Sequence, residues 1–248
     1  MKLLKYIYKK LLKNEKHKKS LKEFFMLLGF RKIFSNYFYS QDGEELLIQS
    51  FGRYEKDYKG FYVDIGAYHP LIYSNTQWFY EKGWNGINID ARPGSMKIFN
   101  KIRKRDINLE IGISEKSAES EYYSFKYSDD MNSFNEALSK ERMNRGDEIK
   151  EIIKIKVFSI NEILEKYLPK CQRIDFITID IEGHEFQIIK TLDFKKYSPR
   201  FFLVEDYFID NDFMEYKDTE LYIFLKERGY VVVGKTIWTI LFEKKHTT

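Results

Sequence analysis

Phe61-Tyr-Val-Asp-Ile-Gly66-Ala-Tyr-His-Pro70 is a short apolar run that ends at a glycine and continues into a turn. Such a run is typical of a buried strand, and the glycine allows the backbone to turn tightly and approach a ligand. Downstream, strand and helix patterns alternate. Further strands are predicted over 86–90, 107–113, 152–158, 175–180 and 201–205, and helices over 75–82, 94–103 and from 159 onward.

This alternation predicts an α/β fold with a doubly wound, Rossmann-like and mostly parallel sheet that carries helices on both faces. Residues 230–242 read as two strands joined around Gly234-Lys235, which predicts a C-terminal antiparallel hairpin. Residues 126–150 are polar and are predicted to form a loop or lid. Acceptor contacts are expected from this region, through Tyr122, Tyr123, Tyr127 and Asn132.

In open α/β sheets, ligands bind beyond the carboxyl ends of the strands. Asp90 ends the second strand and lies 24 residues past Gly66, a spacing at which a carboxylate can accept hydrogen bonds from a ribose. The other candidate residues at this edge are Asp64 and Gly66, Gly112 and Ile113, and the run from Asp180 to Glu185.

Two phosphate-binding motifs are absent from the sequence. After Gly66 the chain reads Ala-Tyr-His-Pro, so the Gly-x-Gly-x-x-Gly dinucleotide fingerprint does not occur, which counts against a nucleotide-sugar oxidoreductase. No Gly-x-x-x-x-Gly-Lys-Ser/Thr loop occurs either, which argues against an NTPase. A nucleoside bound through its ribose and without a pyrophosphate fits better, and S-adenosylmethionine is such a ligand.

Two of the four histidines, His69 and His184, follow predicted strands at the same sheet edge. Either can act as a general base near neutral pH, and His184 is favoured because carboxylates flank it. Asp180, Glu182 and Glu205 also follow strands at this edge. They are expected either to hold Mg²⁺ or Ca²⁺, or to contact the amine of the cofactor and orient His184.

Composition gives weaker guidance. The net charge of +4 does not indicate nucleic-acid binding, and the lone Cys171 excludes an intrachain disulfide and fits a cytoplasmic protein. Residues 1–33 contain eleven Lys or Arg and two Glu, with an apolar stripe at helical spacing. This basic amphipathic segment is expected either to contact the inner face of an anionic membrane or to pack on its own domain.

Four segments resemble motifs of the FkbM-type methyltransferases, in the same order along about residues 38–242. They are Ser40-Gln-Asp-Gly-Glu-Glu45, Phe61-Tyr-Val-Asp-Ile-Gly-Ala67, Gly86-Ile-Asn-Ile-Asp-Ala-Arg-Pro93 and Asp175-Phe-Ile-Thr-Ile-Asp-Ile-Glu-Gly-His-Glu185. The fourth is the most specific. The resemblance implies a class I methyltransferase fold, S-adenosylmethionine as cofactor, and O-methylation of sugars in polysaccharides or of natural products.

The resemblance also implies roles for individual residues. Asp64 and Gly66 would contact the amino-acid end of the cofactor, Asp90 its ribose, and Gly112 and Ile113 its adenine, while Asp180 would face the sulfonium. Ala67, Tyr68 and Arg92 belong to the same motifs and are also expected to bind the cofactor.

The resulting prediction is a basic helical segment over 1–37 followed by a methyltransferase domain over 38–248. Its acceptor is expected to be a glycan or small-molecule hydroxyl, most plausibly a sugar in surface polysaccharide biosynthesis. Two alternatives remain: a methyltransferase of small natural products, and a non-catalytic nucleoside-binding partner of a glycosyltransferase.

Overall fold

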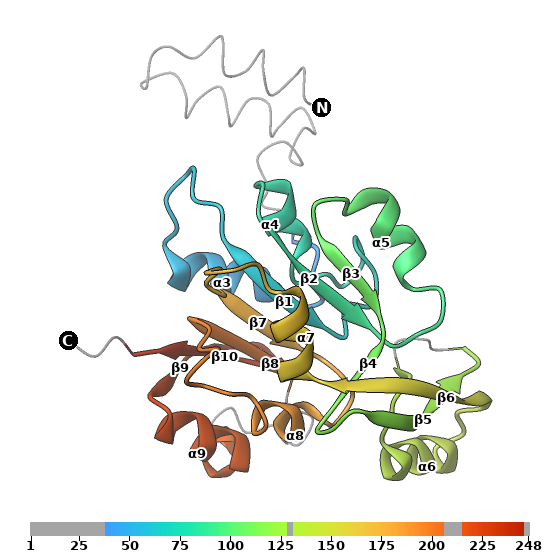
Figure 1. The fold of residues 1–248 in the computed structure, drawn as a ribbon. Coiled ribbons are helices and arrows are strands. Elements are labelled where there is room, and N and C mark those ends of the chain that lie inside the picture. Colours follow the sequence, from blue (N-terminus) through green and yellow to red (C-terminus); the bar gives the residue numbers. More distant parts are fainter. Residues whose placement is uncertain (1–37, 128–130, 206–214, 246–248) are drawn as a thin grey trace, which may run out of the picture. The chain divides into compact units, whose positions relative to one another are not determined.

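A seven-stranded sheet, in the order β3-β2-β1-β7-β8-β10-β9, forms the centre of the computed structural model (Figure 1). The structure describes residues 38–127, 131–205 and 215–245. The strands are β1 (Phe61–Ile65), β2 (Asn85–Asp90), β3 (Ile107–Glu110), β7 (Phe176–Ile179), β8 (Phe201–Glu205), β9 (Tyr230–Lys235) and β10 (Thr239–Lys244). Only β10 pairs antiparallel with its neighbours, β8 and β9. The predicted mostly parallel sheet with a C-terminal antiparallel hairpin is therefore confirmed.

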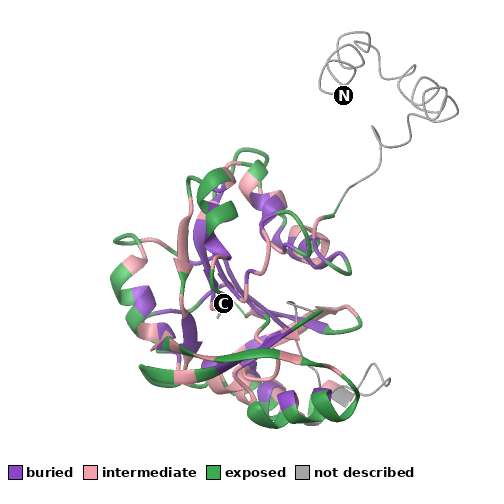
Figure 2. Cartoon of the chain, turned by 90° about the vertical axis from the view of Figure 1, so that its right-hand side faces the viewer, coloured by how far each residue is buried: buried purple, intermediate pink, exposed green. Residues whose placement is uncertain are grey.

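Helices cover both faces of this sheet, because alternate strand residues point to opposite faces. Phe61, Val63 and Ile65 pack in one apolar cluster with residues of α7 (Ile160–Tyr167), α8 (Glu185–Ile189) and α9 (Glu220–Glu227). Tyr62 belongs to a second cluster, with residues of α3 (Glu44–Gly52) and α4 (Gln77–Glu81), while α5 (Met96–Ile102) packs against Ala67. The central strands β1, β2, β7 and β8 are almost entirely buried, and the outer helix faces are exposed (Figure 2). The doubly wound arrangement is confirmed.

A smaller sheet, in the order β4-β6-β5, extends from the main one. It consists of β4 (Gly112–Ser114), β5 (Ala118–Phe125) and β6 (Ile149–Ser159). The predicted strand 107–113 is thus two strands, β3 and β4, which belong to different sheets. Strand β5 was not predicted, because its polar first half is exposed and lacks a clear apolar alternation.

The prediction of a loop over 126–150 is wrong for residues 136–144, which are helical, and for the last two residues, which begin β6. Residues Glu136–Asn144 form helix α6, and the Asn135 side chain caps it by accepting a hydrogen bond from the Leu138 amide at 3.0 Å. The helix was missed because its core-facing side is polar: Ser139 and Arg142 are its buried residues. By contrast, the helix predicted from 159 onward is present as α7, and a capping box between Ser159 and Glu162 marks its start.

Smaller differences concern turns and ends. The β9–β10 turn lies at Thr236–Trp238 rather than at Gly234-Lys235, and the Thr236 amide closes it by donating to the Thr239 carbonyl at 2.8 Å. A short 3₁₀ helix (Glu215–Asp218) precedes α9. The predicted N-terminal segment 1–37 lies outside the described residues. Within the described ranges, no helix has the length and apolar character that a membrane crossing requires.

Candidate functional site

A cavity of about 310 Å³ lies where the main strands end. Two groups of residues line it. The strand-end group lies at the ends of β1, β2, β3, β7 and β8 or directly after them, and comprises Asp64–Tyr68, Ile89–Arg92, Ile111–Ile113, Asp180–Glu182 and Glu205. The remote group comes from elsewhere in the chain and comprises Gln41, Tyr73, Asn75, Tyr122, Met131–Phe134 and Trp238.

Every residue predicted to bind a cofactor belongs to the strand-end group. These residues are Asp64, Gly66, Ala67, Tyr68, Asp90, Arg92, Gly112, Ile113 and Asp180. The structure therefore brings them together in one cavity.

The turn after β1 can contain only glycine at position 66. Gly66 has a φ of +85°, and a Cβ atom there would lie 1.6 Å from the Asp180 carbonyl oxygen. The Gly66 and Ala67 amides both donate to the Ile89 carbonyl, at 2.9 and 3.0 Å, and the Tyr68 amide donates to Asp90 Oδ2 at 2.8 Å. All three amides of this turn are therefore occupied, and none is left to bind a phosphate.

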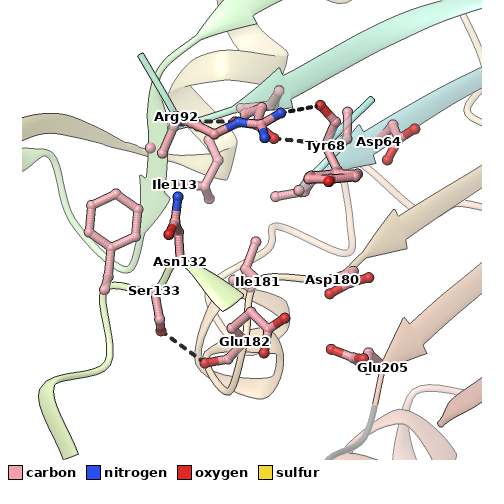
Figure 3. A pocket seen from close by; sticks show the side chains of 18 of the residues that line it. Asp64, Tyr68, Arg92, Ile113, Asn132, Ser133, Asp180, Ile181, Glu182 and Glu205 are labelled. Carbon is pink, nitrogen blue, oxygen red and sulfur yellow. Dashed lines mark hydrogen bonds between the residues drawn. The ribbon is translucent and has the colours of Figure 1, made fainter. Parts of the chain in front are cut away.

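Asp90 organises two loops at once. Its Oδ1 accepts a hydrogen bond from the Arg92 amide at 2.8 Å, while its Oδ2 accepts the one from Tyr68. Arg92 in turn donates to the Tyr68 carbonyl at 2.7 Å, and its guanidinium lies 4.6 Å from the centre of the Tyr68 ring (Figure 3). Burial raises the pKa of Asp90, and the Arg92 charge opposes this rise. Each carboxylate oxygen keeps a further lone pair for a ligand.

Behind the cavity, Asp64 is held by a buried polar network. Its Oδ2 accepts the Thr76 hydroxyl at 2.8 Å, and Thr76 accepts Arg103 Nη2 at 3.0 Å. The Arg103 side chain is completely buried and also pairs with Asp106 at 2.8 Å. Burial raises the pKa of Asp64 to about 6, against the opposing effects of Thr76 and Arg103. Asp64 is thus an anion near neutral pH. Its carboxylate is held by Thr76, which does not line the cavity.

Three carboxyl groups meet at the ends of β7 and β8. Asp180, Glu182 and Glu205 each offer an oxygen atom within 4.8 Å of the others, and Figure 3 shows Asp180 and Glu205 next to each other. Although Asp180 is open to the cavity, the surrounding protein and the Glu182 charge raise its pKa. Burial and the Asp180 charge raise the pKa of Glu205 further. Like charges this close do not ionise together, so Asp180 and Glu205 share a proton at neutral pH.

The third carboxylate, Glu182, is already paired with a positively charged side chain. The buried Arg142 guanidinium, from α6, forms an ion pair with it, and Ser133 donates to the Glu182 carbonyl at 3.1 Å. The next acid, Glu185, accepts the Ile181 and Gly183 amides at 2.9 and 3.1 Å. Glu185 therefore shapes the turn before α8 and does not line the cavity.

Neither predicted histidine lines the cavity. His69 Nδ1 accepts the Leu71 and Ile72 amides, at 3.1 and 3.2 Å. His184 is the N-cap residue of α8; burial lowers its pKa, and its Nε2 has no hydrogen-bond partner among the described residues. The geometry therefore does not support either one as the general base.

Two of the four acceptor contacts expected from the lid region, Tyr122 and Asn132, are at the cavity, whereas Tyr123 and Tyr127 are not. Asn132 is 8% exposed. Its Oδ1 accepts the Phe125 amide at 2.8 Å, which fixes the orientation of the amide group. Its Nδ2 has no partner among the described residues and is therefore available to a ligand. Sequence reasoning assigned no role to Gln41, although it lies in the Ser40–Glu45 motif, and it missed Tyr73 and Trp238, because no pattern in the chain links them to the strand ends.

The strand order and the cavity at the strand ends define the protein as an α/β enzyme with a class I methyltransferase fold. A protein-family model described as the methyltransferase FkbM domain matches residues 64–232, more than half of the chain. The chain therefore belongs to the FkbM methyltransferase family, as the sequence motifs indicated.

Among solved structures, the chain is similar to the methyltransferase FkbM from Methylobacillus flagellatus KT, with 15% sequence identity and a TM-score of 0.45. The similarity covers 82% of this chain and 48% of that one, so the chain spans about half the length of this relative. No curated protein sequence matches the chain.

Proposed function

We propose that this methyltransferase uses S-adenosylmethionine and methylates a hydroxyl group of a sugar. One observation carries the cofactor assignment: the cavity is acidic, and the Gly66, Ala67 and Tyr68 amides after β1 all donate within the protein rather than to a phosphate. Asp64, Asp90 and Asp180 favour a cationic ligand over an anionic one. S-adenosylmethionine carries an ammonium and a sulfonium and no phosphate, unlike a dinucleotide.

The cavity lining offers groups suited to three parts of this cofactor. Asp64 would bind the ammonium, and Asp90 would accept hydrogen bonds from the ribose hydroxyls. Gly112 and Ile113 would line the adenine, where the unpartnered Nδ2 of Asn132 is available to donate to a ring nitrogen. Once bound, S-adenosylmethionine supplies an electrophilic methyl group.

The protein must also accept the proton that the hydroxyl group loses. The Asp180–Glu205 pair is suited to this role, because it shares one proton and can take up a second. We therefore assign the general base to this pair rather than to His184 or His69, which lie outside the cavity lining.

A divalent cation held by Asp180, Glu182 and Glu205 is the competing assignment for this cluster. The ion pair between Glu182 and Arg142 counts against it, because a cation would share one of its three ligands with a buried guanidinium. Activity that persists in the presence of a chelator supports the proton-accepting role.

Aromatic side chains support a sugar as the acceptor. Tyr73, Tyr122 and Trp238 line the cavity, and aromatic rings offer apolar faces beside polar groups. We infer that the reaction belongs to the synthesis of surface polysaccharide at the cytoplasmic face of the membrane. A small natural product is the alternative acceptor.

The test is transfer of a radiolabelled methyl group from S-adenosylmethionine to a panel of glycans and lipid-linked sugars, with and without EDTA. Labelled glycan, lost in Asp180→Asn, supports the proposal. Labelling of small aglycone alcohols alone would favour the natural-product acceptor. If the cofactor binds but no acceptor is labelled, the protein acts as a non-catalytic partner of another enzyme.

A further inference from the structure

Exposed apolar side chains gather at two turns beside the cavity. The described residues include twelve large apolar side chains that are exposed, and five of them lie in these turns: Leu71, Ile72, Tyr73, Ile237 and Trp238. Tyr73 and Trp238 both line the cavity, so the two turns border the same opening. We call these five residues the apolar rim.

Both turns of the apolar rim are held in fixed conformations. His69 accepts the amides of Leu71 and Ile72, and the Tyr73 backbone has a φ of +55°, which is unfavourable for a non-glycine residue. In the other turn, Lys235 Nζ donates to the carbonyls of Thr236 and Ile237, each at 3.1 Å. The apolar side chains are therefore presented to the outside by built turns.

The distribution of charge along the chain indicates which kind of surface the apolar rim binds. The first 33 residues have nine more basic than acidic residues, whereas the rest of the chain has five more acidic than basic ones. This basic stretch is connected to the folded unit at Tyr39, whose carbonyl accepts the amide of Ser74 at 3.1 Å. The folded unit thus begins at a residue that is hydrogen-bonded to Ser74, and Ser74 directly follows Tyr73 of the apolar rim.

We propose that the apolar rim binds the surface of an anionic lipid bilayer. Aliphatic and aromatic side chains enter the interfacial layer, while a basic segment is attracted to the anionic headgroups, and two such contributions together give stable binding. Stacking on a sugar would explain Tyr73 and Trp238, but not the aliphatic Leu71, Ile72 and Ile237. A second protein copy would not explain the strongly basic segment that precedes Tyr39 in the sequence.

Binding to a bilayer would narrow the class of acceptor to a hydroxyl group carried on a membrane lipid, because such a group would reach the cavity from the bilayer surface. That consequence rests on the proposed methyl transfer, whereas bilayer binding does not, so the two can fail separately.

The experiment measures binding of the full chain to vesicles of phosphatidylcholine, alone or mixed equally with phosphatidylglycerol. The test variant is Leu71→Ser/Ile72→Ser, and the matched control is Ile223→Ser, on α9, where the side chain is 48% exposed. We expect the wild type to bind the anionic vesicles more tightly than the neutral ones. The rim variant should bind them about tenfold more weakly or worse, and the control as tightly as the wild type.

Two outcomes would overturn the proposal. One is equal binding of wild type and rim variant to anionic vesicles, or no binding by the wild type. The other is a dimer in solution that the rim variant dissociates, which would make the rim a self-association surface. Thermal unfolding and cofactor calorimetry on the same variants show that lost vesicle binding does not come from misfolding or a damaged cavity.

Discussion

The two groups of residues that line the cavity are built in different ways. Strand-end residues such as Gly66 and Asp90 are fixed by backbone hydrogen bonds between neighbouring loops. Remote residues such as Tyr122 and Trp238 come from the smaller sheet and the C-terminal hairpin. We propose that the residues at the ends of the main strands bind the cofactor, while Tyr73, Tyr122 and Trp238 determine the choice of acceptor. Substitutions in the first group should therefore affect cofactor affinity, and those in the second group acceptor use.

The largest effect is expected at Gly66. Gly66→Ala places a Cβ atom against the Asp180 carbonyl in a left-handed conformation and should lower the free energy of unfolding by about 3 kcal/mol or more. Gly94→Ala is the matched control: its φ is +84°, but its nearest neighbour is Lys97 at 3.7 Å, so only about 1 kcal/mol is expected. Urea unfolding measures both. Equal losses would show that the contact with β7 does not constrain the turn.

Asp90→Ala should weaken cofactor binding about 10- to 100-fold, because it removes a charged acceptor and releases the amides of Tyr68 and Arg92. In the remote group, Trp238→Ala should raise the KM for the acceptor and leave cofactor affinity within about threefold. Calorimetry and methyl transfer separate these effects. A cofactor affinity that falls equally in both variants would contradict the division between the two groups.

The carboxyl pair gives a pH-dependent prediction. The folded state holds the Glu205 proton more tightly than the unfolded chain, in which glutamate titrates near ~4.3. This contribution to stability is complete below that pH and is lost as the pH rises. Glu205→Gln should therefore stabilise the protein at pH ~8 by about 1 kcal/mol or more, and much less at pH ~5.

The control for this comparison is Glu136→Gln, because the Glu136 side chain is 60% exposed on α6. Urea unfolding of each variant at both pH values is the measurement. If Glu205→Gln and Glu136→Gln respond alike to pH, Glu205 is an ordinary ionised carboxylate, and the shared proton is refuted.

The smallest effect is expected behind the cavity, at Thr76. Thr76→Val removes the hydroxyl that links Asp64 to Arg103 and should weaken cofactor binding about fivefold, while Thr76→Ser keeps the hydroxyl and the affinity. Because Asp64 loses a donor, its pKa should rise, and the affinity of the Val variant should fall more steeply as the pH drops toward ~6. Identical pH profiles for Val and Ser would leave Thr76 a purely structural role.

Sequence reasoning was most successful where local pattern and chemistry coincide. The apolar run 61–65 predicts a strand, and Gly66 predicts the turn that follows it. Asp90, at the end of the next strand, predicts a ligand contact at the same edge of the sheet. The mostly parallel pairing of the strands then follows from their alternation with helices. For this reason the main sheet, and the cavity position of every predicted cofactor residue, could be read from the chain.

The remainder depends on contacts between segments that are distant in sequence. Whether His184 faces the cavity is decided by a turn whose shape comes from Glu185 and from two residues with positive φ, Glu182 and Gly183. The buried face of α6 is polar because Arg142 reaches Glu182, forty positions along the chain. Local periodicity in the sequence contains neither fact. For this reason helix α6 was predicted as a loop, and the two histidines were predicted at the cavity, which they do not line.

The central claim is that the strand-end group binds S-adenosylmethionine, and calorimetric titration of the wild type tests it most directly. S-adenosylmethionine, its demethylated product, NAD and a nucleotide sugar are the ligands. We predict micromolar binding of the first two and none of the others. No binding of S-adenosylmethionine to folded protein, or tighter binding of NAD, would contradict the account.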